Sequence, residues 1–202
     1  MKVEIVPYSE KYSKFFYDLN HDWLSEFFYV EEYDEKVLKN CKEEIIDKGG
    51  YIFFALYDGE VVGTMALIPR EKSIYELNKM AVKKDLRGNG IGHQLIQFII
   101  DYSVKNNFES VILYSNTVLK NSIHLYNKFG FKEIDNPDAP YKRSDIKMEL
   151  KYLTLENNFS FQFVHEYFLA NTARRIGKTI KGVIQSVIPR LGSEISIRID
   201  SV

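Results

Sequence analysis

The sequence predicts an α/β fold in which helices cover both faces of a mixed central sheet. Two observations lead to this prediction. Asp58 and Gly59 separate two apolar runs, and an Asp-Gly pair in that position is typical of the turn of an antiparallel hairpin. Further along, a strand pattern, a glycine-rich stretch, a helix pattern and another strand pattern follow one another, which indicates a parallel crossover. Antiparallel and parallel pairs together give a mixed sheet.

The first half of the chain contributes strands and two helices. Apolar residues at helical spacing predict the first helix. Asp34 is the expected N-cap of the second helix, and Gly49 and Gly50 are its expected stop. In chain order, the predicted elements are a strand at 3–7, helices at 9–28 and 34–48, and strands at 51–57, 61–68 and 74–82.

The second half continues the alternation. An amphipathic pattern predicts a helix over 91–102, and a short apolar run bounded by polar residues predicts a buried strand over 110–114. A further helix is expected from Asn121 to Gly130, where the glycine suits a left-handed cap. The last predicted strands of the main domain, which comprises residues 1–152, lie near 131–134 and 146–152.

Residues 153–202 form a predicted C-terminal extension. Its helix is indicated by an apolar stripe at helical spacing, which consists of Ile176, Ile180, Val183, Ile184, Val187 and Leu191. Ile195, Ile197 and Ile199 then alternate with polar residues, as in a half-buried terminal strand. The extension either covers part of the main domain or forms a homodimer by adding its strand to another subunit.

Composition argues against several kinds of partner. The 202 residues carry a formal net charge of −1, which gives no reason to expect nucleic acid or an anionic membrane. No apolar run is long enough to span a bilayer, and the N-terminus lacks a signal-peptide core. The single cysteine, Cys41, excludes an intrachain disulfide, so a cytoplasmic protein is expected. The histidines show no metal-ligand spacing, so no metal is expected.

The most informative stretch spans residues 87–93, between a predicted strand and a predicted helix. Its glycines allow a tight turn and a close approach of ligand to backbone, and the helix after it begins with unpaired N–H groups. These features favour a phosphate ligand. ATP or GTP is disfavoured because His93 and Gln94 follow Gly92, where a Walker loop has Lys and then Ser or Thr. A dinucleotide is disfavoured because position 93 is not glycine and the loop lies in mid-chain.

Arg87, Gly90 and Gly92 spell Arg-x-x-Gly-x-Gly, which resembles the pyrophosphate loop of the GNAT superfamily of acetyl-coenzyme A-dependent N-acetyltransferases. Two further segments resemble that family in the same order. Residues 76–82 look like its central strand. Residues 121–131, with an Asn, a later Tyr and a terminal Gly-Phe, are similar to its second cofactor-contacting segment. The resemblance covers roughly residues 1–152.

The resemblance implies the GNAT fold and an enzyme that moves an acetyl group from acetyl-coenzyme A to a primary amine. Direct transfer in a ternary complex is expected, and the acceptor is a small-molecule or peptide amine whose identity stays open. Two alternatives belong to other classes. One is a non-catalytic acyl-coenzyme A binder that regulates or contacts a partner, and the other is a homodimeric scaffold built on residues 153–202.

The resemblance also implies which residues contact the cofactor. The strand bulges near Met80, a backbone amide there faces the thioester carbonyl, and Val82 pairs with the pantetheine arm. Arg87 closes the loop or contacts phosphate, and Asn121 either bonds the cofactor arm or caps its helix. The expected cofactor-binding residues are Met80, Ala81, Val82, Arg87, Gly88, Asn89, Gly90, Ile91, Gly92, His93 and Asn121.

Glu76 and Tyr126 are the expected catalytic residues. A lysine-like amine titrates near ~10.4, so a base must take its proton at neutral pH. Glu76 matches a base position of the family, and partial burial would raise its pKa; the alternative is a surface pair with a neighbouring Lys. Tyr126 matches the acid that protonates the departing thiolate, and the alternative is a core aromatic.

Overall fold

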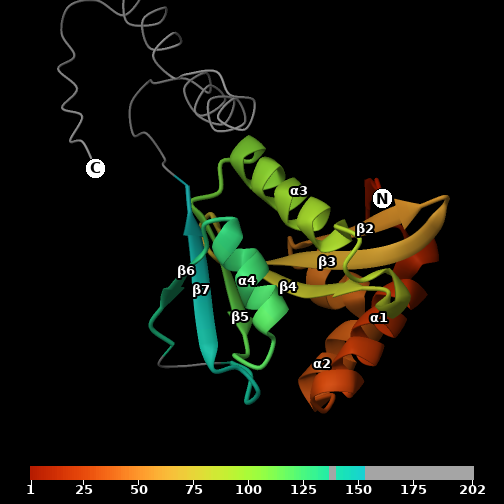
Figure 1. Ribbon diagram of the computed structural model, residues 1–202, viewed down its shortest axis with the longest axis horizontal. Helices are drawn as coiled ribbons and strands as arrows, with labels where there is room; N and C mark the ends of the chain where they lie inside the picture. The colour runs from red at the N-terminus through yellow and green to blue at the C-terminus, as the bar shows by residue number, and fades with distance from the viewer. Residues whose placement is uncertain (137–139, 153–202) are drawn as a thin grey trace, which may run out of the picture. The chain divides into compact units, whose positions relative to one another are not determined.

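The computed structural model describes residues 1–136 and 140–152, in which seven strands form one sheet (Figure 1). The strand order is β1-β2-β3-β4-β5-β7-β6. Only the β4–β5 pair is parallel, so the predicted mixed sheet is confirmed. The strands are β1 (Glu4–Pro7), β2 (Tyr51–Tyr57), β3 (Glu60–Glu71), β4 (Ile74–Val82), β5 (Ser110–Ser115), β6 (Lys132–Ile134) and β7 (Ile146–Lys151).

Helices cover both faces of this sheet, as the sequence predicts. Figure 1 shows α3 and α4 on one side of the sheet and α1 and α2 on the other. The α-helices are α1 (Ser13–Phe27), α2 (Glu32–Lys39), α3 (Ile91–Lys105) and α4 (Lys120–Lys128). Short 3-10 turns are η1 (Glu10–Tyr12) and η3 (Lys84–Leu86), and η2 (Lys42–Ile46) is a π-helical turn.

Two apolar cores result from the alternation of side chains along the strands. Successive strand residues point to opposite faces, so the neighbours Phe53 and Phe54 of β2 enter different cores. Phe53 packs in the core that holds Leu95 of α3 and Phe131. Phe54 packs in the core that holds Phe16 of α1, with 6.5 Å between the two ring centroids.

The β2–β3 hairpin turns at the predicted Asp-Gly pair. Asp58 has φ 49° and Gly59 has φ 82°. Positive φ at both central residues is the requirement of a two-residue turn that matches the twist of the strands. The hairpin prediction is therefore confirmed in its location and in its physical cause.

The second predicted helix is wrong in its limits. It begins at Glu32, where Asp34 is the third residue and accepts from the Glu31 backbone N–H at 3.4 Å, so Asp34 is not the N-cap. The α-helix also ends at Lys39, because Asn40 has φ −119° and ψ 44°, outside the helical region, and the chain continues in the π-helical turn η2. The stop is correct, since Gly49 has φ 82°.

The parallel pairing between β4 and β5 is short, and the two strands separate beyond it. The two strands pair only from Ile74 opposite Ser110 to Glu76 opposite Ile112. Beyond Glu76, β4 continues beside β3 to Val82, whereas β5 continues beside β7 to Ser115. The sheet is therefore divided beyond Glu76, along the strand that leads to the glycine-rich loop.

A β-bulge interrupts β4 just past this point. Thr64 of β3 pairs with Ala81 and Ala66 pairs with Asn78, so a single β3 residue lies opposite the two residues Lys79 and Met80. Lys79 has φ 49°, which is strained for a side-chain-bearing residue. A bulge near Met80 is what the family resemblance implies.

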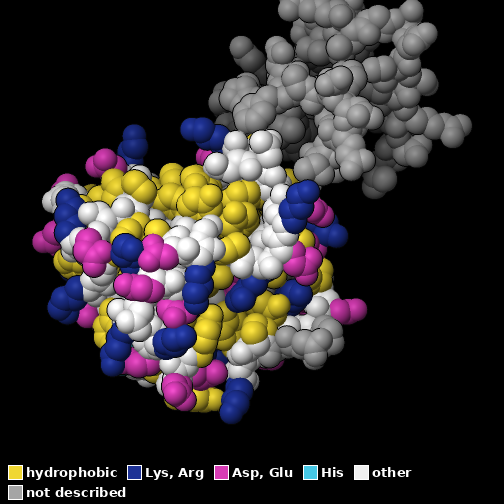
Figure 2. All heavy atoms as spheres, turned by 180° about the vertical axis from the view of Figure 1, so that it is seen from behind, with side chains coloured by type: hydrophobic (Ala, Val, Ile, Leu, Met, Phe, Trp, Pro, Cys, Tyr) yellow, Lys and Arg dark blue, Asp and Glu magenta, His cyan; other side chains and the backbone are white. Residues whose placement is uncertain are grey.

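The described surface mixes charges of both signs. Figure 2 shows Lys and Arg side chains interspersed with Asp and Glu side chains on the face opposite to that in Figure 1. Within residues 1–136 and 140–152, no helix has the length and apolar character needed to cross a membrane. The predicted helix and strand of residues 153–202 lie outside the described residues, so the proposed domain boundary and dimer stay predictions.

Candidate active site

The glycine-rich loop has the backbone conformation that glycine alone adopts readily. Gly88 has φ 85° and Gly90 has φ 80°. A Cβ added at either glycine would meet no atom within 4 Å, so the space beside the loop is open. Gly90 is the N-cap of α3, and the first N–H groups of that helix have no intrahelical acceptor. The loop therefore offers donors and a helix N-terminus to an anion.

A cavity of about 540 Å³ lies against this loop, within the range of ligand-binding pockets. It joins three segments: the end of β4, the glycine-rich loop and the start of α4. The predicted cofactor residues that line it are Met80, Ala81, Val82, Arg87, Gly88, Ile91, Gly92 and Asn121.

The remaining predicted cofactor residues, Asn89, Gly90 and His93, are not among the residues that line the cavity. Asn89 donates to the Leu86 carbonyl at 3.2 Å. The His93 ring packs against Phe129, with 4.5 Å between the ring centroids. Asn121 lies one residue after α4 begins at Lys120, so the alternative in which it caps the helix is wrong.

Arg87 fastens the loop to its surroundings. Its Nη1 lies 2.8 Å from Glu26 of α1, and its Nε donates to the carbonyl of Val82 at 3.2 Å. The guanidinium also lies over the Phe27 ring, 5.9 Å from its centroid. These contacts correspond to loop closure, one of the two roles expected from the sequence.

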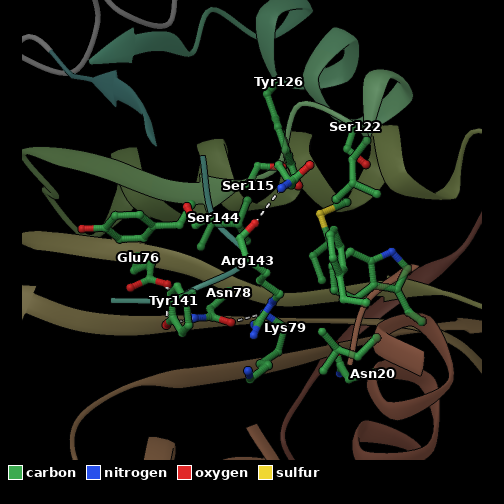
Figure 3. Close-up of a pocket in the computed structure, with 18 residues that line it drawn as sticks. Asn20, Glu76, Asn78, Lys79, Ser115, Ser122, Tyr126, Tyr141, Arg143 and Ser144 are labelled. Atoms are coloured by element: carbon green, nitrogen blue, oxygen red, sulfur yellow. Dashed lines mark hydrogen bonds between the residues drawn. The ribbon is translucent and has the colours of Figure 1, made fainter. Parts of the chain in front are cut away.

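A second, smaller cavity of about 90 Å³ lies between the divided strands and α1 (Figure 3). Met80 and Tyr126 line both cavities, so they stand where the two meet. Glu76 lines the smaller cavity only. Both predicted catalytic residues and eight of the eleven predicted cofactor residues thus line two adjoining cavities.

Glu76 is almost fully buried, with 1% of its surface exposed, which excludes the alternative of a solvated surface pair. Arg70 forms an ion pair with its carboxylate and donates from Nε at 2.6 Å. Asn78 donates to the same carboxylate at 2.5 Å, and the Tyr141 hydroxyl donates at 3.0 Å. Burial and the Glu76 charge raise the pKa of Tyr141, which keeps this hydroxyl protonated as a donor.

Tyr126 projects from α4 to the junction of the cavities (Figure 3). Its ring contacts Phe131, with 5.8 Å between centroids, so it is partly a packing residue. Burial raises the pKa of Tyr126 to about 12. The phenol is therefore protonated at neutral pH and can donate to an anion in the cavity.

A cluster of three charged residues, which the sequence did not predict, lies below the β4 bulge. Lys79 Nζ lies 2.5 Å from Asp34 of α2, and Arg143 contacts the same carboxylate at 2.6 and 3.0 Å. Lys79 is 7% exposed and Asp34 is 0% exposed. Burial alone would raise the pKa of Asp34, but Lys79 and Arg143 hold it below its usual value. Burial lowers the pKa of Lys79.

The sequence around Arg70, Tyr141 and Arg143 has little that could have identified them as site residues. Arg70 reaches Glu76 because β3 and β4 form a hairpin in which Pro69 lies opposite Tyr75. Tyr141 and Arg143 lie between β6 and β7, in a segment without periodicity. The hairpin could have indicated the first contact, whereas the other two depend on long-range folding.

The described residues give no candidate metal site, and Cys41 is not a candidate nucleophile. In the part of the chain that the structure describes, no group of three or more His, Cys, Asp or Glu residues is placed to hold a metal ion. Cys41 is 3% exposed and belongs to the core beneath α1 and α2, away from both cavities.

The family model described as "Acetyltransferase (GNAT) family" matches residues 12–131. The chain belongs to the GNAT acetyltransferase family. The match includes β4, the glycine-rich loop and α4, which carry the predicted cofactor residues of this GNAT protein. The resemblance stated from sequence is therefore confirmed.

Several curated proteins are similar over part of the chain. It is 34% identical over 83 residues to "Probable N-acetyltransferase 14" of Xenopus tropicalis, covering 40% of each chain. It is 34% identical over 88 residues to "N-acetylaspartate synthetase" of Danio rerio, covering 43% of this chain and 31% of the relative. It is 30% identical over 96 residues to "Uncharacterized N-acetyltransferase YjgM" of Escherichia coli, covering 46% and 58%. The chain thus spans less than two thirds of the length of these relatives.

Solved structures show that the GNAT fold prediction is correct. An acetyltransferase of the GNAT family from Staphylococcus aureus Mu50 matches 74% of this chain and 99% of its own, with 21% identity and a TM-score of 0.67. The PaiA N-acetyltransferase from Thermoplasma acidophilum, solved in complex with coenzyme A, matches 75% and 100%, with 21% identity and a TM-score of 0.62.

Proposed function

We propose that this GNAT protein transfers an acetyl group from acetyl-coenzyme A directly to a primary amine. One observation carries the proposal: the cavity beside the glycine-rich loop meets the cavity beside Glu76, and Met80 and Tyr126 line both. A long ligand held at the loop can therefore present its reactive end to an amine bound on the other side. No covalent intermediate is needed, because both reactants share one site.

The residues of the larger cavity and of the adjoining loop suit coenzyme A chemically. The open space at Gly88 and Gly90 admits a pyrophosphate against the loop, and the N-terminus of α3 favours its negative charge. Val82, at the end of β4, is suited to pairing with an amide of an extended arm. Acetyl-coenzyme A supplies the activated acetyl group, and the PaiA structure from Thermoplasma acidophilum holds coenzyme A.

Glu76 is the proposed base. The three side chains that donate to its carboxylate fix its position beside the smaller cavity. These donors occupy most of its lone pairs, so it accepts the proton of the acceptor ammonium through an intervening water. The neutral amine nitrogen then bonds to the acetyl carbon, and the carbon–sulfur bond breaks.

The bulge at Met80 supplies the proposed oxyanion donor. Lys79 and Met80 have no partner residue in the β3–β4 register, so the Met80 amide is available to the site. A preorganised backbone donor of this kind contributes about 3 kcal/mol in other acyl transfers. Tyr126 donates its phenolic proton to the departing thiolate, and the tyrosinate then takes the second proton of the attacking nitrogen through water as the amide bond is completed, which restores the phenol.

The experiment that tests this proposal measures release of free coenzyme A thiol from acetyl-coenzyme A with a panel of primary amines. We expect at least one amine to accelerate release, and calorimetry to show coenzyme A binding at one site per chain. Lack of binding would remove the proposed cofactor cavity.

One observation favours a second candidate, a non-catalytic acyl-coenzyme A binder. Arg70, Asn78 and Tyr141 already engage the Glu76 carboxylate, as a purely structural group would be engaged. This candidate predicts tight binding of coenzyme A with no amine-dependent thiol release. Glu76→Gln separates the two, since a base is lost in that variant while coenzyme A binding is kept.

A further inference from the structure

The smaller cavity is lined by charged side chains of opposite sign. Glu76, Lys79 and Arg143 line it, and Figure 3 shows all three around the same space. The carboxylates that pair with the two cations, Asp34 and Glu31, are not among its lining residues. The wall of the cavity therefore presents two cations and one carboxylate.

The two cations share one buried counter-charge. Asp34 Oδ1 accepts from Lys79 at 2.5 Å and from Arg143 at 3.0 Å, and Oδ2 accepts from Arg143 at 2.6 Å. Glu31 contacts Arg143 at 3.0 Å from the outer side, where its side chain is 17% exposed. The negative charge of Glu76 is already matched by Arg70. Asp34 and Glu31 together balance the two cations, but neither carboxylate lines the cavity, so Lys79 and Arg143 are the charged residues at this end of its wall.

Lys79 also has unused donors. An ammonium carries three N–H groups, and within the described residues only Asp34 accepts from this one. Lys79 is 7% exposed and is a lining residue of the cavity, so its other N–H groups have little access to bulk water. Buried donors without acceptors are unfavourable, and an anionic group in the cavity would satisfy them.

The dimensions of the cavity restrict the acceptor further. At about 90 Å³, it is far smaller than the 540 Å³ cavity at the glycine-rich loop. A polyamine would bring a second ammonium beside Lys79 and Arg143, where like charges repel. A compact molecule with one cation and one anion matches both the size and the charges of the walls.

We propose that the acceptor is a small amine that carries a carboxylate, as an amino acid does. Its amine lies on the Glu76 side, and its carboxylate binds Lys79 and Arg143. This proposal rests on the proposed function, because it assigns the second substrate of the same transfer.

The first test compares acceptors matched in shape. Thiol release is measured with each common amino acid, and the best one is paired with its primary amide and with the amine that lacks the carboxyl group. We expect kcat/KM to fall at least about tenfold for both carboxylate-free partners. Equal rates for the three compounds would overturn the proposal.

The second test uses Arg143→Gln, with Lys142→Gln as the matched control, because Lys142 is the exposed neighbour and lines neither cavity. Arg143→Gln should raise KM for the amino acid about tenfold and leave KM for its amide unchanged, and Arg143→Lys should restore part of the affinity. An equal loss for both acceptors would show a merely structural role and would overturn the proposal.

Calorimetry of the same amino acids with the coenzyme A-saturated protein gives a readout without turnover. Binding that is weakened by Arg143→Gln supports the proposal, and no binding of any amino acid overturns it. Failure of the proposed function looks different, since coenzyme A would then not bind, or no amine of any class would release thiol.

Discussion

The two cavities of this GNAT protein are built in different ways. The larger one depends on backbone: positive φ at Gly88 and Gly90, the first turn of α3 and the end of β4. The smaller one depends on side chains, because Glu76 and Lys79 of β4 meet Arg143 from a distant part of the chain there. Backbone recognition suits a ligand shared by a whole family, whereas side-chain recognition can change with each acceptor.

The largest expected effect is on coenzyme A affinity at the larger cavity, which is built from backbone. Gly90→Asp should weaken coenzyme A binding at least about 1000-fold, roughly 4 kcal/mol, because it places a side chain in a left-handed position and a negative charge beside the pyrophosphate. Calorimetry measures this affinity. Gly59→Asp is the matched control, since Gly59 has φ 82° and open space but lies at the β2–β3 turn. Retained affinity in Gly90→Asp would show that the loop does not bind the cofactor.

For the smaller cavity, which is built from side chains, Asp34→Asn should lower the free energy of unfolding by about 3 kcal/mol. The variant leaves the buried Lys79 without a counter-charge, and urea denaturation measures the loss. Asp18→Asn is the control, because Asp18 pairs with an exposed lysine and should cost less than about 1 kcal/mol. Equal losses in both variants would contradict the importance of the buried pair.

The same residue predicts a dependence on pH. The folded-state pKa of Asp34 is lowered, so its contribution to stability is present above the unfolded value near ~3.9 and is lost as pH falls through the folded value. Between neutral pH and acid, the wild type should therefore lose more stability than Asp34→Asn. Parallel pH profiles of the two proteins would contradict the assigned ion pair.

Tyr126 stands between the two cavities, and its prediction concerns turnover. Tyr126→Phe should lower kcat about 100-fold with little change in coenzyme A affinity, because only the proton donor is removed. Tyr102→Phe on α3 is the control, since Tyr102 lines neither cavity. Unchanged kcat in Tyr126→Phe, with chemistry rate-limiting, would remove the acid role.

The smallest effect is expected at Arg87. Arg87→Gln should weaken coenzyme A binding less than about fivefold, because the ion pair with Glu26 is partly exposed and only fastens the loop. Lys84→Gln, which removes the other cation on Glu26 without touching the cavity, is the control. A loss much larger than fivefold in Arg87→Gln would indicate direct phosphate contact instead.

The same contrast explains what could be predicted from sequence. The Asp58-Gly59 turn and the loop at Gly88 and Gly90 were predictable because each depends on local backbone conformations that the residue types dictate. The limits of α2 were wrong because Asn40 leaves the helical backbone region between α2 and η2, which an apolar pattern does not indicate.

The cluster of three charged residues below the β4 bulge could not be predicted from sequence, for a different reason. Asp34, Lys79 and Arg143 lie on α2, on β4 and between β6 and β7, so their contact exists only after the chain has folded. Glu76 was found through a family resemblance, but its partners Arg70 and Tyr141 were not. Their positions follow from strand pairing and from a segment without periodicity.

The separation of β4 and β5 beyond Glu76 matters for aggregation by strand addition as well as for ligand binding. It creates unpaired strand edges in the interior of a sheet, where a neighbouring protein cannot approach to add a strand. We expect a narrow molecule with an amide group to be the kind of ligand that can pair with this edge of β4. The unpaired edge of β4 is thus open to a narrow ligand, while its place inside the sheet protects it from aggregation by strand addition.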